Sequence, residues 1–179
     1  MRRRRSALVV GFALLALLVA FLSPAAGGQQ RQRRIVALTP FAANTLAKLG
    51  VTPIAVGQTL GGRERLSPKL RHVPILKLSH PIGPNLEQLT ALRPGLVLSS
   101  KTWAKGNQAM EQLGIRVESR DPRSISGALA DTYKIGEAVG RRHYARELLK
   151  RMRKRIAGAE SGVRRHPKVM LILGVGHAP

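Results

Sequence analysis

The sequence contains no cysteine, and this absence excludes several kinds of structure. A chain without thiols forms no disulfide, offers no thiolate metal ligand and has no cysteine to carry a lipid. Aromatic residues are also scarce, at 3% of 179 residues, so the core must be aliphatic. We therefore expect a fold held together by the packing of aliphatic side chains.

Acidic residues are also few: the sequence has nine aspartates and glutamates but 31 lysines and arginines. The formal net charge of +22 favours a polyanionic partner, such as nucleic acid, anionic lipid or an acidic polymer of the cell envelope. Nucleic-acid recognition often relies on aromatic side chains that stack on bases, and this chain has few of them. We expect no nucleic-acid partner.

Motifs of catalysis are missing as well. The chain has no G-x-S-x-G, no H-E-x-x-H and no pair of carboxylates at a useful spacing. Ser99 and Ser100 follow an apolar run without an identifiable base, and residues 174–176 (Gly-Val-Gly) lack the third glycine of a phosphate-binding loop. Histidines and carboxylates do not stand at metal-ligand spacing. We expect no enzyme, no catalytic residues, no metal site and no resident cofactor.

The N-terminus has the pattern of an export signal. Four arginines precede an apolar run from Ala7 to Leu22, and Ser23 and Ala25 follow at the spacing that a signal peptidase accepts. Residues 1–28 are therefore predicted to be a signal peptide, which sends the protein to the periplasm or cell envelope. The run is slightly longer than a usual signal core, so an uncleaved membrane anchor is the alternative.

The chain after this segment alternates short apolar strands with helices. Such alternation predicts an α/β fold, a parallel sheet with helices on both faces, whose ligands bind at the strand-to-helix loops on one edge. The predicted strands are 34–38, 53–57, 95–100 and 115–119, and the predicted helices are 40–49, 85–92, 105–113 and 124–139.

Residues 141–161 have a different character. Tyr144, Leu148, Met152 and Ile156 recur every four residues, and the other faces are strongly basic. A basic amphipathic helix can lie on an anionic membrane, but the thin stripe without Trp or Phe favours a helix packed along a domain. The run "KVMLILG" (168–174) then predicts another buried strand.

Three stretches together resemble one family: "RIVALTPFAANTLAKLGVTPIAVG" (34–57), "PNLEQLTALRPGLVLSS" (84–100) and "LGIRVESRDPRSISGALADTYKIGEAVG" (113–140). They resemble the substrate-binding proteins of ABC importers for cobalamin, iron–siderophores and haem. Those proteins have two α/β lobes joined by one long helix, with the ligand in the cleft between them. The sequence departs from the family pattern at Ala43-Asn44, usually Thr-Glu, and at Gly95, usually Asp.

The resemblance implies a division of the chain. It makes residues 29–140 the N-terminal lobe, 141–164 the linking helix, and 165–179 the start of a second lobe that is truncated. It implies an exported solute-binding protein that captures an iron–siderophore, cobalamin, haem or a similar metal chelate. Its other partner would be the membrane permease of the importer, so the membrane is reached through that permease or through an uncleaved N-terminal helix.

The resemblance also gives Glu87 a function. In cobalamin-binding members the matching glutamate projects from the lobe and meets arginines of the permease. The alternative for Glu87 is a first-turn carboxylate that the helix dipole favours by about 0.3–1 kcal/mol. Permease docking is the favoured interpretation, and one residue can do both.

Ligand contacts are expected from loops at the carboxyl ends of the strands. Trp103 is predicted to flank a corrin, porphyrin or catecholate, or else to cap its own helix. The basic candidates would pair with an anionic ligand. The possible axial ligands of haem are Tyr133, Tyr144, His72 and His80, but packing is favoured for both tyrosines. The candidate ligand-binding residues are Thr39, Pro40, Phe41, Arg63, Arg65, Lys101 and Trp103.

Two other functions stay open on the sequence. The first is a membrane-anchored basic surface protein that binds anionic polymers. The second is a non-functional truncated remnant, whose exposed half-interface would aggregate.

Overall fold

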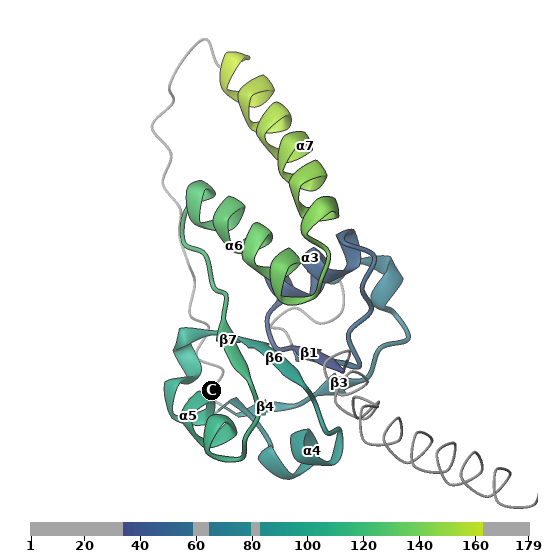
Figure 1. The fold of residues 1–179 in the computed structure, drawn as a ribbon, viewed down its shortest axis with the longest axis vertical. Coiled ribbons are helices and arrows are strands. Elements are labelled where there is room, and N and C mark those ends of the chain that lie inside the picture. Colours follow the sequence, from purple (N-terminus) through teal and green to yellow (C-terminus); the bar gives the residue numbers. More distant parts are fainter. Residues whose placement is uncertain (1–33, 59–64, 80–82, 163–179) are drawn as a thin grey trace, which may run out of the picture.

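The computed structural model describes residues 34–58, 65–79 and 83–162. A five-stranded sheet, with all strands parallel, has the order β3-β2-β1-β6-β7 (Figure 1). A second, two-stranded antiparallel ladder pairs β4 with β5. The strands are β1 Ile35–Ala37, β2 Ala55–Gly57, β3 Ile75–Leu76, β4 Leu78–Ser79, β5 Gly83–Pro84, β6 Leu96–Ser99 and β7 Val117–Ser119.

Five α-helices lie among the described residues, and two short 3-10 helices accompany them. The α-helices are α3 Pro40–Lys48, α4 Leu86–Ala91, α5 Ala104–Gln112, α6 Ile125–Ala138 and α7 Arg142–Ser161. The 3-10 helices are η2 Pro68–Leu70 and η3 Lys101–Trp103. Within the described ranges, no helix combines the length and apolar character needed to cross a lipid bilayer.

The sheet separates two hydrophobic clusters, because successive strand residues point to opposite faces. On one face, Ile35 and Ala37 pack with buried residues of α3, α6 and α7. On the other face, Val36 and Val97 pack with buried residues of α4 and α5, among them Met110. The predicted α/β class with helices on both faces of a parallel sheet is confirmed, and so is its aliphatic core.

Three of the helices begin at residues whose side chains cap them. The hydroxyl of Thr39 accepts from the Ala42 amide at 3.2 Å, and Asn85 Oδ1 accepts from the Gln88 amide at 2.9 Å. Ser124 accepts from the Gly127 amide at 3.0 Å in the same way. Each cap satisfies a backbone amide that the helix leaves without a partner and stabilises the helix by about 1 kcal/mol.

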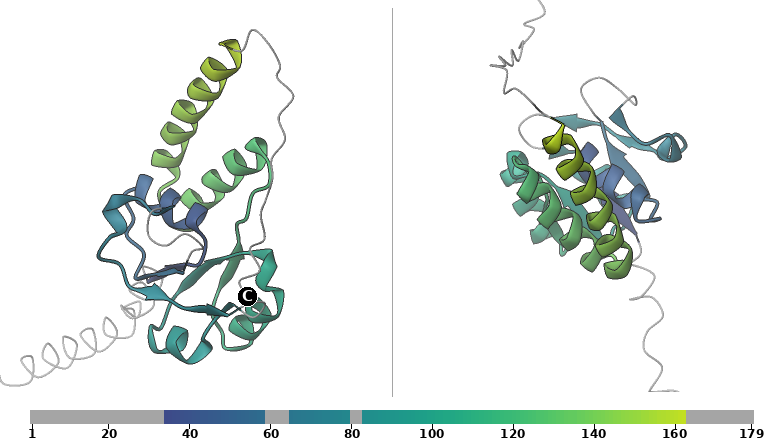
Figure 2. Two further views of the ribbon diagram at one scale, coloured as in Figure 1. Left: turned by 180° about the vertical axis from the view of Figure 1, so that it is seen from behind. Right: turned by 90° about the horizontal axis from the view of Figure 1, so that it is seen from above.

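The long helix α7 packs on α6 and extends past it (Figure 1 and Figure 2). Its buried residues are Ala145, Leu148 and Leu149, whereas Tyr144 is 55% exposed. The predicted stripe with a four-residue repeat was therefore wrong at Tyr144. A helix turns every 3.6 residues, so a strict repeat of four drifts around its surface and leaves the buried face. The strand predicted at 168–174, and with it the start of a second lobe, lies outside the described residues.

Candidate ligand-binding site

The carboxyl ends of β1 and β6 lie side by side. Their register pairs Ala37 with Leu98, and the Leu38 amide donates to the Leu98 carbonyl at 2.8 Å. The segments that leave these strands, 38–41 and 100–103, therefore start from adjacent points on one edge of the sheet. This is the edge at which open α/β sheets bind their ligands.

The first segment offers less free surface than expected. Thr39 is buried, and its hydroxyl already accepts the capping hydrogen bond from Ala42. Pro40 is half-buried at the first position of α3. Phe41 is half-buried and packs against the cluster beneath α3, α6 and α7. Pro40 and Phe41 thus keep partial exposure near the edge, whereas Thr39 positions the start of the helix.

The second segment carries a cation and an aromatic ring. Lys101 is exposed in η3, and Trp103 at its end is half-buried against the cluster that contains Met110. Gly83, with φ +100°, lies so close that an added Cβ would stand 3.2 Å from Trp103 Cγ. The structure thus packs one part of the indole against the fold and leaves another part exposed, and contact with a ligand stays a prediction for Trp103.

A buried polar network fixes this segment, and sequence reasoning missed it. The Ser99 hydroxyl donates to Asn107 Oδ1 at 2.6 Å. Asn107 Nδ2 donates to the Ser100 carbonyl at 2.9 Å and to the Ser119 hydroxyl at 3.2 Å. The Ser100 hydroxyl donates to Asp121 Oδ2 at 2.6 Å. The network joins β6, β7 and α5 directly beneath Lys101 and Trp103, so it holds their backbone in place.

The missed partners carried only a weak sequence signal. Two serines at a strand end followed by Asn107 suggest a polar turn, but nothing local connects them with Ser119 or Asp121. Those contacts form because β7 lies beside β6 in the sheet, with Ser99 opposite Ser119.

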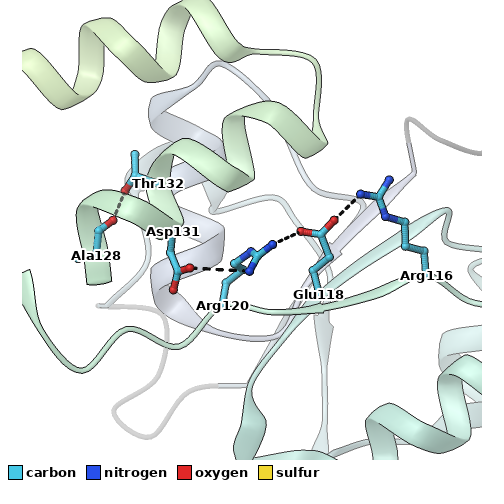
Figure 3. A network of polar contacts seen from close by, with 6 residues as sticks. All are labelled: Arg116, Glu118, Arg120, Ala128, Asp131 and Thr132. Carbon is cyan, nitrogen blue, oxygen red and sulfur yellow. Dashed lines mark hydrogen bonds and ion pairs between the residues drawn. The ribbon is translucent and has the colours of Figure 1, made fainter. Parts of the chain in front are cut away.

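A chain of charges runs along β7 and reaches α6 (Figure 3). Glu118 forms ion pairs with Arg116 and with Arg120, the latter at 2.7 Å. Arg120 Nη1 lies 3.8 Å from Asp131 Oδ1 on α6, and the Arg120 amide donates to the Ser99 carbonyl at 2.9 Å. Arg120 therefore connects the end of β7 with both its neighbouring strand and the helix above it.

The basic loop candidates are only partly described. Arg63 lies outside the described residues. Arg65 is exposed, and its carbonyl accepts from Asn44 Nδ2 at 2.8 Å. Asn44 Oδ1 also accepts from the Ser67 amide at 2.7 Å. Asn44, one of the departures from the family pattern, thus ties the loop end to α3.

Glu87 is exposed in the first turn of α4. Helix α4 lies at one end of the long axis of the molecule, and α7 lies at the other (Figure 1 and Figure 2). The carboxylate is thus available on the surface, far from the strongly basic helix α7.

The residues considered for haem ligation lie apart from the edge. Tyr133 packs against the cluster beneath α3, α6 and α7. Tyr144 is on α7, where its ring meets His143 edge-on at 5.8 Å and the Arg141 guanidinium lies 5.3 Å from it. His72 is exposed, and His80 lies outside the described residues. No group of three or more His, Asp or Glu side chains suited to a metal occurs in the described part of the chain.

A cavity of about 370 Å³ lies between α3 and α7. Phe41, Leu148 and Met152 supply its apolar surface, and its three cations meet no carboxylate among the lining residues. The complete lining is Phe41, Asn44, Thr45, Lys48, Thr132, Leu148, Arg151, Met152 and Arg155.

Comparison with known proteins agrees with this fold. Residues 35–179 match the family model described as periplasmic binding protein. The chain is 30% identical over 146 residues to the high-affinity heme uptake system protein IsdE of Staphylococcus aureus, covering 79% of this chain and 48% of that protein. The chain therefore belongs to the periplasmic binding protein family, and it spans about half the length of the curated relatives it matches.

Solved structures share the fold of this chain. S. aureus IsdE complexed with heme superposes with a TM-score of 0.60 and 25% identity, over 75% of this chain and 52% of that one. An ABC transporter substrate-binding protein from Listeria monocytogenes superposes with a TM-score of 0.63 and 24% identity, over 75% of this chain and 50% of that one. The vitamin B12 binding protein BtuF of Vibrio cholerae superposes with a TM-score of 0.61 and 14% identity, over 72% of this chain and 50% of that one. Each likeness covers about half of the other chain.

Proposed function

We propose that this chain is the N-terminal half of an exported solute-binding protein of an ABC importer. It captures a large metal chelate, an iron–siderophore, cobalamin or haem, and delivers it to a membrane permease. The observation that carries the proposal is the sheet edge, where the exposed Lys101 and the half-exposed Trp103 follow β6 beside the segment that follows β1. Export depends on residues 1–28, which lie outside the described residues.

The chemistry of this edge suits such a ligand. A partly exposed indole offers a flat apolar surface to a corrin, a porphyrin or a catecholate ring. The Lys101 ammonium offers a charge to the carboxylates of haem or to the net negative charge of a ferric siderophore. Membership of the family supports a binding function rather than catalysis, as do relatives named for uptake and substrate binding.

Binding by this chain alone should be weak. In the two-lobed proteins that it resembles, the ligand lies between lobes, and this chain supplies one of the two sides. Fewer contacts are then available to offset the loss of translational and rotational freedom. Delivery would follow when exposed glutamates such as Glu87 meet arginines of the permease, a step that complementary charge favours.

Fluorescence titration tests the proposal, because Trp103 is the only tryptophan in the chain. We would titrate the exported protein with haem, cobalamin and a ferric siderophore, and follow both Trp103 emission and ligand absorbance. Quenching by one ligand, weakened several-fold for an anionic ligand in K101Q, is the expected result. W103F, whose binding is followed by ligand absorbance, is the control for quenching that does not arise from a specific contact with Trp103.

Two outcomes would count against the proposal. If none of the three ligands changes either signal, the edge does not bind this class of chelate. If residues 29–179 alone bind one of them at sub-micromolar affinity, the claim that half of the site is supplied elsewhere is wrong.

A further inference from the structure

The outward side of α7 carries a continuous row of cations. Arg146, Lys150, Arg153 and Lys154 lie four, three and one residues apart along the helix, and all four are exposed. We call these four residues the basic ridge. The side of the helix facing α6 holds the buried Ala145 instead. The ridge is thus the solvent side of an amphipathic helix, on which side chains of one face lie three or four residues apart.

Most of the charge on the basic ridge is not neutralised locally. Lys150 donates to Glu147 at 2.9 Å, and this hydrogen bond is the main cause of the lowered pKa of Glu147. Within the described ranges, Arg146, Arg153 and Lys154 form no ion pair. The packed helix α6 contributes Glu137, but this carboxylate pairs with Arg142, outside the ridge, at 2.8 Å. Three cations therefore remain free to meet an anionic partner.

The position of the ridge narrows the choice of partner. Glu87, the proposed contact with the permease, is on α4, at the opposite end of the long axis from α7 (Figure 1 and Figure 2). A molecule docked through Glu87 presents its α7 end away from the permease and the bilayer around it. The ridge would then meet material of the envelope rather than the lipid surface.

We propose that the basic ridge binds a linear polyanion with phosphodiester charges, of the kind formed by a glycerol-phosphate polymer. Arg146, Lys150 and Lys154 stand one turn apart, a rise of about 6 Å each, so a flexible phosphodiester chain can place one charge near each side chain. Arginine guanidinium groups bind phosphate oxygens through two hydrogen bonds. The preference for a polymer over a lipid surface rests on the proposed docking through Glu87. The binding of an anion by the basic ridge does not depend on that docking.

Two matched variants of the full chain test this inference. One removes the ridge charges (R146Q/K150Q/R153Q/K154Q). The control removes the same number of arginines and lysines from exposed positions on other elements (K69Q/R93Q/K105Q/R123Q). Binding of poly(glycerol phosphate), and of phosphatidylglycerol vesicles at equal phosphate, would be measured across a range of salt concentrations, with circular dichroism as the check on folding.

The ridge variant should bind the polymer at least about 10-fold more weakly, and the slope of log affinity against log salt should fall by up to about 3, as expected for four lost phosphate contacts. The control should lose less than about 3-fold, and E147Q should bind more tightly than the unmodified chain because it removes the paired acid. Equal losses in both variants would show that net charge alone drives binding. Tighter binding to vesicles than to polymer, or no polymer binding, would also overturn the inference. None of these outcomes depends on chelate capture, so the proposed function is tested separately.

Discussion

The hydroxyl of Ser99 donates a 2.6 Å hydrogen bond to Oδ1 of Asn107, and both side chains are buried. This contact joins the end of β6 to the second turn of α5. Because Asn107 Nδ2 also donates to Ser100 and Ser119, one carboxamide connects three elements. The segment that carries Lys101 and Trp103 therefore depends on the buried side chain of Asn107.

Replacement of Asn107 should destabilise the lobe and loosen this loop. Asn107→Ala leaves the buried hydroxyl of Ser99 without its partner, which costs about 1–3 kcal/mol. Urea unfolding would measure the loss of stability, and Trp103 emission should shift to the red in the folded state. Gln108→Ala, at an exposed neighbouring position, is the control. An unchanged stability would mean that water replaces the carboxamide.

A close contact between α6 and α7 should make Gly136 intolerant of any side chain. A Cβ at Gly136 would overlap the Cβ of Ala145 on α7. Gly136→Ala should therefore cost about 1–3 kcal/mol through overpacking, despite the better helix propensity of alanine. In the double variant G136A/A145G the overlap is removed, so a double-mutant cycle should give a favourable coupling. Additive effects would show that the helices simply move apart.

The ion pairs of β7 should differ in strength according to their exposure. Glu118, whose side chain is 14% exposed, lies between two guanidinium groups, so Glu118→Gln should cost about 1–2 kcal/mol. Glu137→Gln breaks a more exposed pair with Arg142 and should change stability by less than about 0.5 kcal/mol. Thermal unfolding of both variants at low and high salt would measure this order. Equal effects would mean that burial does not strengthen the Glu118 pairs.

The titration of Glu147 should depend on Lys150. The pKa of Glu147 is lowered by its hydrogen bond with Lys150 and then by the charge of Lys150. A carboxylate with a lowered pKa stabilises the folded state above its unfolded pKa, and this contribution is lost as pH falls through the folded value. Carboxyl NMR titration should show the pKa of Glu147 moving up in K150Q. No movement would indicate that the pair is not formed in solution.

Glu87 should matter for docking and not for folding. Glu87→Gln removes an exposed charge from α4 without disturbing the Asn85 cap, so stability should change by less than about 0.5 kcal/mol. Association with the permease should weaken about 10-fold, because a charge pair across an interface is lost. Glu111→Gln, an exposed acid on α5, is the matched control. Equal weakening by both variants would indicate a general charge effect.

Local chemistry made much of the fold predictable. Thr39, Asn85 and Ser124 were each identifiable as helix caps because the hydrogen bond of a cap spans only three residues. Strands β1, β2, β6 and β7 were predicted because each is a short apolar run. The α/β class followed from the alternation of these strands with helices. Strand β3 was missed, since a two-residue strand exists only by pairing with β2 and has no pattern of its own.

The candidate site was predictable only in outline. The edge was identified from topology, and Lys101 and Trp103 do follow β6 at that edge. The sequence could not indicate that the hydroxyl of Ser100 meets Asp121, which follows the neighbouring strand. This contact depends on the tertiary arrangement. Tyr144 was misplaced for a simpler reason, the drift between a repeat of four residues and a helical turn of 3.6.

The charges along β7 also bear on how the lobe behaves at high concentration. Strands β7 and β3 stand at the two ends of the sheet order, where an open edge can recruit a strand from another molecule. β3 offers only two residues, and β7 offers three, with Glu118 in the middle and Arg116 and Arg120 on either side. A neighbouring chain that added to β7 would have to separate or bury these ions. The ion pairs of Glu118 along β7 therefore oppose edge-to-edge polymerisation of the sheet.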